Sequence, residues 1–305
     1  RLVSTQQEAV GMQGQQPQPV RLGVIGGSGV YQMQGIEPVA EHAVATPFGA
    51  PSDAVVETTV EGRTVVFLPR HGRGHRLLPG EINARANVHA LKQLGVTHVL
   101  AVSAVGIMQP QIRPGDMVVP DQLFDRTGGR RPSTFFGDGI AGHVTFADPF
   151  CRQLSAAVAD AAVDCGATVH RGGTYVCMEG PQFSTRAESE FYRRAVGATV
   201  IGMTALPEAK LAREAEMCYA ILAMGTDYDC WHETEADVEI ASVLAVLRQN
   251  AALASATVKA LALALPDACD CACHHAAEQA IITAPQAITA QARERLQLLF
   301  GRYLQ

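Results

Sequence analysis

Short apolar runs recur along the chain from Arg21 onward, and most of them end at glycine, proline or a polar residue. Runs with such boundaries are typical of strands that are buried in a sheet. The predicted strands are Leu22–Ile25, Thr64–Leu68, His98–Ser103, Asp116–Val119, Thr174–Met178, Thr199–Met203 and Cys218–Met224.

Helical periodicity separates several of these runs. The longest helical stretch has Thr234 and Asp237 placed to cap its start, and Pro266 ends it. The predicted helices are Gly80–Leu94, Asp148–Asp164, Pro207–Glu216, Glu235–Leu265 and Ile288–Tyr303. This alternation predicts an α/β fold, a single domain with a central mixed β-sheet flanked by helices.

The first twenty residues are polar and rich in glutamine, without periodic apolar positions. We expect residues 1–20 to form a flexible N-terminal tail, followed by one domain over residues 21–305. That domain includes a cysteine-rich segment and a helix from about residue 266. The tail has no apolar stretch typical of a signal peptide, and Ala251–Leu265 is short and contains Lys259. We therefore expect a cytoplasmic protein.

Composition narrows the classes of partner. Hydrophobic residues make up 48% of the chain and charged residues 18%, which favours a large buried core and excludes a mostly disordered chain. The net charge is −6, with 24 basic and 30 acidic residues. Because such a chain does not attract polyanions, we expect a small-molecule ligand, and neither nucleic acid nor membrane.

Four predicted strand ends carry groups that bind anions. Gly26–Gly29 is a glycine-rich turn that contains the hydroxyl of Ser28, although a simple tight turn explains it equally well. The turn is no dinucleotide fingerprint, because Gln32 stands where the third glycine belongs. Arg70 and His71 follow the next strand and suit phosphate oxygens, with a charged surface turn as the alternative.

Ser103 and Ala104 end a third strand and supply a hydroxyl and backbone amides. Thr204 ends a fourth strand and supplies another hydroxyl, beside the soft apolar side chain of Met203. Ligands gather at the carboxyl ends of strands in open α/β sheets. The sequence therefore predicts a phosphate site at these ends, with an apolar surface for a sugar beside it.

Asp227 and Asp229 directly follow the strand Cys218–Met224. Positions i and i+2 of an extended chain face the same way, so both carboxylates can address one ligand. Phe183 could stack on a flat heterocycle or pack in the core. Paired aspartates also bind metals, but His232 is the one further ligand nearby, so we expect no metal here.

In this order, the motifs resemble those of the methylthioadenosine phosphorylases of the trimeric purine nucleoside phosphorylase family. The resemblance covers about Arg21 to Leu265. The matching motifs are Ile25–Gly29, Thr46–Gly49 with Pro51-Ser52, Arg70–Gly72, Glu179–Pro181 with Phe183-Ser184, Met203-Thr204 with Pro207-Glu208, and Thr226–Trp231. The resemblance implies a nucleoside phosphorylase-like fold, and a homotrimer or a dimer of two trimers.

The resemblance also implies a role for each matching residue. Ser28, Arg70, His71, Ser103, Ala104 and Thr204 would surround phosphate. Phe183, Ser184, Asp227 and Asp229 would frame the purine, and Met203 would lie against the ribose. His143 would reach the methylthio end of a neighbouring subunit's ligand, and Val243 would form a wall of that pocket.

The expected reaction is phosphorolysis of S-methyl-5'-thioadenosine to adenine and 5-methylthioribose 1-phosphate, a step of purine and methionine salvage. Inorganic phosphate is the expected co-substrate, with no cofactor. Asp227 would protonate purine N7, and Asp229 would accept from the 6-amino group or orient Asp227. A broader activity on adenosine, inosine or methylthioinosine stays open, as do a nicotinamide-dependent oxidoreductase and a non-catalytic nucleoside-binding protein.

Cys269, Cys271 and Cys273 crowd together before His274 and His275. Reduced structural thiols, a disulfide and a metal site are all open for this run. The alternating Cys-x-Cys spacing suits one tetrahedral ion less well than paired Cys-x-x-Cys motifs do, so metal carries the least weight.

Overall fold

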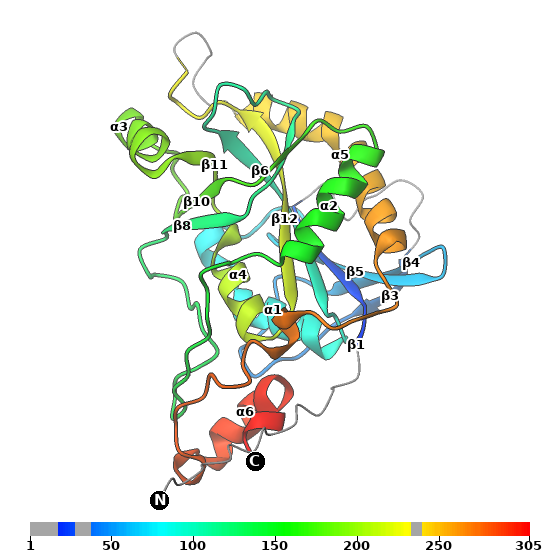
Figure 1. The fold of residues 1–305 in the computed structure, drawn as a ribbon, viewed down its shortest axis with the longest axis vertical. Helices are drawn as coiled ribbons and strands as arrows, with labels where there is room; N and C mark the ends of the chain where they lie inside the picture. The colour runs from blue at the N-terminus through cyan, green and yellow to red at the C-terminus, as the bar shows by residue number, and fades with distance from the viewer. Residues whose placement is uncertain (1–17, 28–37, 233–239) are drawn as a thin grey trace, which may run out of the picture.

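The computed structural model describes residues 18–27, 38–232 and 240–305, apart from the side chains of residues 240–245 and 247–249. Its centre is a mixed sheet of eleven strands with helices on both faces, which confirms the predicted fold class (Figure 1). The main path runs β3 (Pro38–His42), β4 (Val55–Val60), β5 (Arg63–Pro69), β2 (Leu22–Gly26), β6 (His98–Ile107), β11 (Ala198–Gly202), β10 (Thr174–Met178) and β8 (Gln122–Arg126).

The sheet branches at β6. β12 (Cys218–Asp227) pairs parallel with β6, β7 (Met117–Val119) pairs antiparallel with β12, and β9 (Val169–Arg171) pairs parallel with β7. β2 is parallel to both β5 and β6, whereas β11 runs antiparallel to β6. On one edge, β6 is parallel to β12 over nearly its whole length. On the other edge, the parallel neighbour β2 at the start of β6 is replaced by the antiparallel neighbour β11 at its end.

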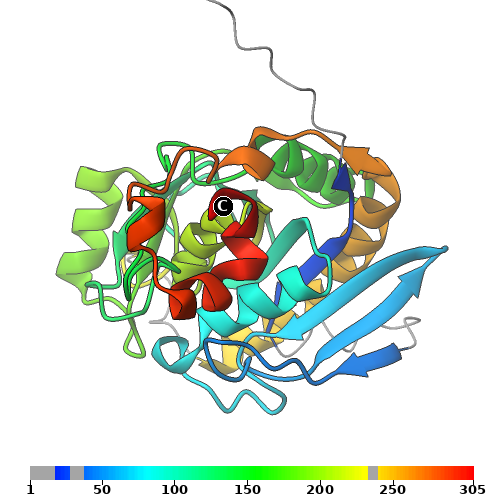
Figure 2. The same cartoon turned by 90° about the horizontal axis from the view of Figure 1, so that it is seen from below.

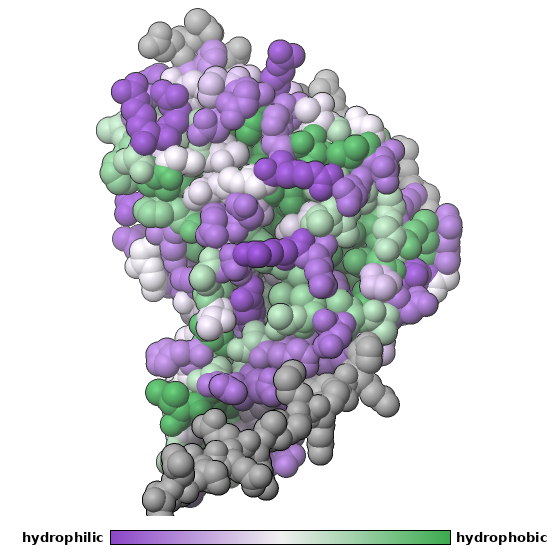
Figure 3. All heavy atoms as spheres, in the orientation of Figure 1, coloured by the Kyte–Doolittle hydropathy of each residue, from purple (hydrophilic) through white to green (hydrophobic). Residues whose placement is uncertain are grey.

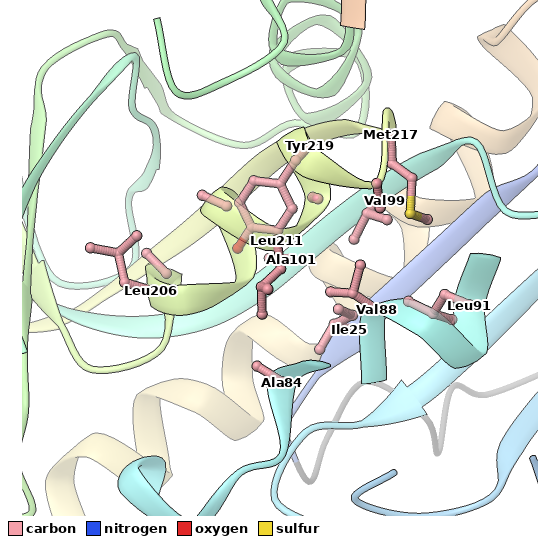
Figure 4. Close-up of a cluster of buried hydrophobic side chains, with 14 of the residues drawn as sticks. Ile25, Ala84, Val88, Leu91, Val99, Ala101, Leu206, Leu211, Met217 and Tyr219 are labelled. Carbon is pink, nitrogen blue, oxygen red and sulfur yellow. The ribbon is translucent and has the colours of Figure 1, made fainter. Parts of the chain in front are cut away.

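Side chains alternate across β6 between two cores. Val99 and Ala101 face α1 (Ala84–Gln93) and α4 (Ala205–Glu214), with Tyr219, Val88 and Leu211 in the same cluster (Figure 4). Leu100 and Val102 face the other way, toward α2 (Arg152–Asp164) and α5 (Ile240–Ala264). The central strands are buried on both faces, as their continuous apolar runs predict.

The C-terminal segment covers one end of the molecule. It comprises β13 (Ala268–Cys269), the short 3-10 helices η3 (Ala272–His275) and η4 (Pro285–Ala287), α6 (Ala290–Phe300) and η5 (Gly301–Tyr303). α6 packs against α1 (Figure 2). Tyr303 donates to a carboxylate oxygen of Glu216 (2.7 Å), and the Ala277 N–H donates to the same oxygen (3.0 Å). These two hydrogen bonds attach the C-terminal segment to Glu216, which lies just before β12.

Every predicted strand is present, and the helices differ mainly at their ends. The predicted start of the longest helix at Glu235 and its caps Thr234 and Asp237 lie outside the described residues. The expected helix over Gly80–Leu94 is split into η1 (Pro79–Glu81) and α1, because Ile82 is extended and the Asn83 side chain accepts from Ala86 N (3.2 Å) to start α1. Sequence analysis missed α3 (Arg186–Phe191), the π-helical turn after it (Tyr192–Val196), and the strands β3, β4, β8 and β9. These strands are short or half exposed, so they lack a continuous apolar run.

Residues 1–17 of the predicted tail lie outside the described residues. Its last residues are paired: β1 (Gln18–Pro19) forms a two-stranded antiparallel sheet with β13. Within the described part of the chain, no helix has the length and apolar character needed to cross a membrane. Figure 3 shows hydrophilic and hydrophobic residues interspersed over one face of the molecule.

Candidate functional site

The site centres on the place where β6 changes its partner. On one edge, β6 pairs with β2 as far as Ala101, and it pairs with β11 from Gly106. Among the described strands, none is registered with residues 102–105 on that edge. Ser103 and Ala104 lie in this interval, where their edge of the strand has no partner strand among the described residues. Their predicted role in binding phosphate stays a prediction.

Arg70 reaches this interval but is largely committed to the protein. Its Nε and Nη2 donate to the two carboxylate oxygens of Glu208 (2.6 and 3.2 Å). Nη1 donates to Val102 O (3.0 Å), and Nη2 also donates to Ile25 O (3.2 Å). These bonds occupy four of the five guanidinium N–H groups. Arg70 is therefore buried and links β2, β6 and α4, and it does not present an open fork. One of its N–H groups makes no hydrogen bond to the described residues.

Charge around Arg70 is balanced locally. Burial alone lowers the pKa of Arg70, but the Glu208 carboxylate outweighs burial and raises it. Glu208 also accepts from the Tyr219 hydroxyl (3.0 Å). The arginine therefore stays charged inside the core, and most of its charge is compensated before any ligand binds.

His71 lies next to this pair in a defined tautomer. Its Nδ1 donates to Leu77 O (2.8 Å), since a carbonyl can only accept. Burial and the positive charge of Arg70 lower the pKa of His71 to about 4. At neutral pH the ring is therefore uncharged, with Nε2 as a hydrogen-bond acceptor. His75 stacks on it at 4.2 Å between ring centroids and fixes the ring plane further.

The Tyr175 hydroxyl, which is buried and has no hydrogen-bond partner among the described residues, lies near Ser103 and Thr204. Burial raises the pKa of Tyr175, and the neighbouring hydroxyls of Ser103 and Thr204 oppose that rise. The Tyr175 oxygen lies over Gly202, where an added Cβ would be only 2.0 Å away. Thr204 precedes α4, but its side chain makes no capping bond there. The structure thus brings two of the predicted phosphate hydroxyls together. The third, Ser28, lies outside the described residues.

Asp227 and Asp229 lie side by side at the end of β12, although not in the way the sequence suggested. Asp229 has a left-handed backbone (φ 52°) and donates its N–H to Asp227 Oδ1 (2.9 Å), so the chain turns here and is not extended. Both residues still converge on Gly106, where an added Cβ would lie 3.4 Å from Asp227 Oδ1 and 3.4 Å from Asp229 Cβ. The expected pairing of the carboxylates is present, but it rests on a turn rather than on strand alternation.

Burial raises the pKa of both aspartates. At Asp227 this effect is opposed by the Thr226 hydroxyl, which donates to Oδ2 (2.7 Å), and by the Asp229 N–H. A carboxyl group in such a place holds its proton to higher pH than an exposed one. This property suits a proton donor to a leaving group.

The loop after β10 carries Phe183 and Ser184 to the aspartates. The Cys230 thiol, next to Asp229, donates to Ser184 O (3.3 Å). The Phe183 side chain is 49% exposed, so it is not the core residue that the alternative interpretation required. Its ring is free to stack on a ligand.

Arg131 joins this loop to the segment of Met203. Its guanidinium donates to Glu179 Oε2 (2.9 Å), Glu179 O (2.6 Å), Met203 O (2.6 Å) and Leu206 O (2.8 Å). Met203 in turn lies against Gly180, where an added Cβ would be 2.5 Å from its sulfur. The predicted purine and ribose elements are therefore held together by one buried arginine.

The structure does not bring His143 to the rest of the site. The side chain is exposed, and the backbone N–H donates to Ala280 O in the C-terminal segment (2.8 Å). Val243 lies within α5, and its side chain is not among those described. The predicted roles of these two residues in the methylthio pocket stay predictions.

Sequence analysis gave no role to Glu208, Tyr175 or Arg131. Glu208 and Arg131 are ionisable yet 2% and 6% exposed. The Pro207-Glu208 motif was a usable signal for Glu208, whereas Arg131 stands in a polar stretch without any pattern. Residues that position others through tertiary contacts leave little trace in local sequence.

Comparisons with known proteins agree with this geometry. A family model described as the phosphorylase superfamily matches residues 21–263. The S-methyl-5'-thioadenosine phosphorylase of Geobacter sulfurreducens is 54% identical over 93% of this chain and 99% of its own length, and that of Koribacter versatilis is 52% identical over 92% and 96%.

Solved structures show the same relationship. A methylthioadenosine phosphorylase from an antarctic soil metagenomic library superposes with a TM-score of 0.86 at 45% identity, over 92% of this chain and 99% of that one. The Schistosoma mansoni methylthioadenosine phosphorylase in complex with adenine gives a TM-score of 0.76 at 39% identity, over 80% and 91%. The chain therefore belongs to the phosphorylase superfamily, as its ordered motifs predicted.

Proposed function

We propose that the chain is a pentosyltransferase that cleaves S-methyl-5'-thioadenosine with inorganic phosphate, giving adenine and 5-methylthioribose 1-phosphate. The observation that carries the proposal is the pair of aspartates beside Gly106, Asp229 buried and Asp227 partly buried. Gly106 lies on β6 just after Ser103 and Ala104, where that edge of the strand has no partner among the described strands. A site with a proton donor at one end and anion donors at the other suits the transfer of a sugar from a base to phosphate. The relatives that are about half identical to this chain bear the name of this activity.

Phosphate is held by neutral donors more than by charge. The proposed donors are the hydroxyls of Ser103 and Thr204, the Ala104 amide, the remaining Nη1 N–H of Arg70 and the hydroxyl of Ser28, which lies outside the described residues. His71 Nε2 accepts the P–OH hydrogen of protonated phosphate, since Nδ1 carries the ring proton. Because Glu208 compensates Arg70, the site keeps phosphate nucleophilic instead of trapping it in a tight ion pair.

The reaction transfers the sugar from the purine base to phosphate. A phosphate oxygen forms a bond to the anomeric carbon while the bond from that carbon to purine N9 breaks, and its electron pair moves into the base. Asp227, whose pKa burial raises, delivers a proton to N7, and the base leaves neutral. Asp229 accepts from the 6-amino group, and the Phe183 ring stacks on the base.

The sugar and its methylthio group complete the site. Met203 supplies a soft apolar surface for the ribose. His143, exposed beside the C-terminal segment, reaches the ligand of a neighbouring subunit, and Val243 lines the same pocket. This arrangement needs a homotrimer, alone or as a dimer of two trimers, whose subunits complete one another's sites.

A panel of nucleosides tests the substrate. With phosphate in excess, kcat/KM is measured for methylthioadenosine, adenosine, inosine and methylthioinosine. A carboxylate in the position of Asp229 accepts from an amino group but, when ionised, repels a 6-oxo group, so we expect methylthioadenosine to exceed methylthioinosine by at least about tenfold. Equal values for the two would replace this proposal by a broader purine nucleoside phosphorylase.

A further inference from the structure

Four cysteine sulfurs meet in the core, away from the aspartates and the hydroxyl cluster. Cys151, Cys218, Cys271 and Cys273 are all buried, and their Sγ atoms lie within 4.8 Å of one another. The residues come from three segments: the start of α2, the start of β12 and the stretch around η3. Sequence analysis considered only the run of cysteines after residue 268, so it missed the partners that the fold supplies.

The spacing of the sulfurs matches a metal site and not a disulfide. The Cys151 and Cys271 sulfurs are 3.7 Å apart. Four sulfurs at about 2.3 Å from a tetrahedral zinc ion lie about 3.8 Å from one another. A disulfide requires about 2.05 Å between its sulfurs, and all four cysteines are free thiols here.

The surroundings favour thiolates. Cys151 is the N-cap residue of α2, and its sulfur accepts from the Leu154 N–H (3.4 Å). The N-terminal end of a helix stabilises negative charge. Cys271 and Cys273 lie in a turn that is fixed by the His274 N–H, which donates to Cys271 O (2.8 Å). The earlier objection to Cys-x-Cys spacing does not apply, because the run contributes only two of the four ligands.

We propose that Cys151, Cys218, Cys271 and Cys273 bind one structural zinc ion. Four protein ligands close the coordination sphere, so the ion takes no part in the reaction. It links α2, β12 and the C-terminal segment, which in turn pairs with the loop of His143 through Ala280 and Ala141. The ion therefore attaches the C-terminal segment to the rest of the fold. This proposal does not depend on the proposed function.

A second group of possible ligands provides the control. The metal-binding atoms of His98, Cys269 and His274 also lie within 4.8 Å of one another, but this group shares no residue with the four cysteines. Cys269→Ser therefore removes a neighbouring thiol from the same run and leaves the proposed site intact. Cys151→Ser removes a ligand that lies 120 residues from its partner Cys271 along the chain.

The test is elemental analysis of protein purified without a histidine tag from zinc-supplemented cells. We expect about one zinc per chain in the wild-type protein and in Cys269→Ser, and a loss of most of it in Cys151→Ser. All eight cysteines should react with a thiol reagent after denaturation in the presence of a chelator. Zinc-free wild-type protein, fewer than eight reactive thiols, or zinc lost only in Cys269→Ser would each overturn the proposal.

The absorption spectrum of cobalt-substituted wild-type protein tests the proposal even if Cys151→Ser does not fold. Wild-type protein in which Co²⁺ replaces the native ion should show intense visible bands of tetrahedral cobalt, with thiolate charge-transfer absorption in the near ultraviolet. A weak octahedral spectrum, or none, would overturn the proposal without any variant. Chelation should also lower Tm in the wild-type protein, because metal binding is coupled to folding.

Discussion

Arg70 and Glu208 form a bidentate ion pair in the core, with Nε–Oε1 and Nη2–Oε2 distances of 2.6 and 3.2 Å and both side chains 2% exposed. The pair joins the end of β5 to α4, and its other bonds reach β2 and β6. It thereby fixes the strand ends that present the candidate phosphate donors. Sequence analysis assigned Arg70 to a ligand or to a charged surface turn, but the residue is buried and connects these strand ends.

Removing Glu208 should therefore damage stability first. Glu208→Gln leaves the buried Arg70 charge uncompensated, and breaking such a pair costs about 3–5 kcal/mol of unfolding free energy. Urea denaturation measures the loss, and Glu278→Gln, at an exposed carboxylate, is the matched control. A loss in Glu208→Gln no larger than in the control would show that the pair contributes nothing to the fold.

His71 should act on phosphate and not on the nucleoside. His71→Gln removes the Nε2 acceptor and the stacking with His75, and one hydrogen bond to a charged group is worth about 1.5–3 kcal/mol. We expect the KM for phosphate to rise at least about tenfold, with the KM for methylthioadenosine nearly unchanged. Steady-state kinetics with each substrate varied in turn measures both. A rise confined to the nucleoside would place His71 elsewhere in the site.

The activity should fall as pH rises through the pKa of Asp227. Burial raises this pKa, so the protonated donor persists above the usual range of an aspartate and is lost only at higher pH. The same shift makes the protonated group a contribution to stability that is present at low pH and disappears as pH rises through the folded pKa. The pH profile of kcat measures the first effect.

Asp227→Asn cannot donate this proton and should lower kcat by about 10²- to 10⁴-fold. It should also abolish the decline at high pH, which a merely structural role would not alter. Near-normal turnover in this variant, or an unchanged pH profile, would remove Asp227 from the chemistry.

Arg131 should act as a positioning residue. Arg131→Met leaves the backbone carbonyls of Glu179, Met203 and Leu206 without their donor, so the loops on both sides of the ribose should loosen. We expect a higher KM for the nucleoside, partial recovery in Arg131→Lys, and little change in the exposed neighbour Arg130→Met. If Arg130→Met gave the same defect, the effect would belong to the loop and not to the guanidinium.

The sheet could be predicted because its central strands are buried on both faces, so each of them has a continuous run of apolar residues. The hairpin of β3 and β4 could not, because many of its residues are partly exposed and share no single period. Asp227 and Asp229 were found for a reason that the structure revises, since their proximity comes from the left-handed turn at Asp229.

The buried side chains that organise the site were harder to foresee. Glu208 and Arg131 act on partners that are 138 and at least 47 residues away along the chain. The four-cysteine cluster likewise joins Cys151 to a run of sequence near the other end. Local patterns report periodicity and turns, whereas pairing at this range depends on the topology of the sheet.

The most direct test of the central claim is the dependence of adenine release on phosphate. Protein freed of phosphate is incubated with methylthioadenosine, with and without added phosphate, and free adenine and the sugar product are measured. We predict adenine release only when phosphate is present, in equal amount with 5-methylthioribose 1-phosphate. Release at the same rate without phosphate, with free methylthioribose as the product, would contradict the account and indicate a hydrolase, and no release under either condition would indicate a binding protein.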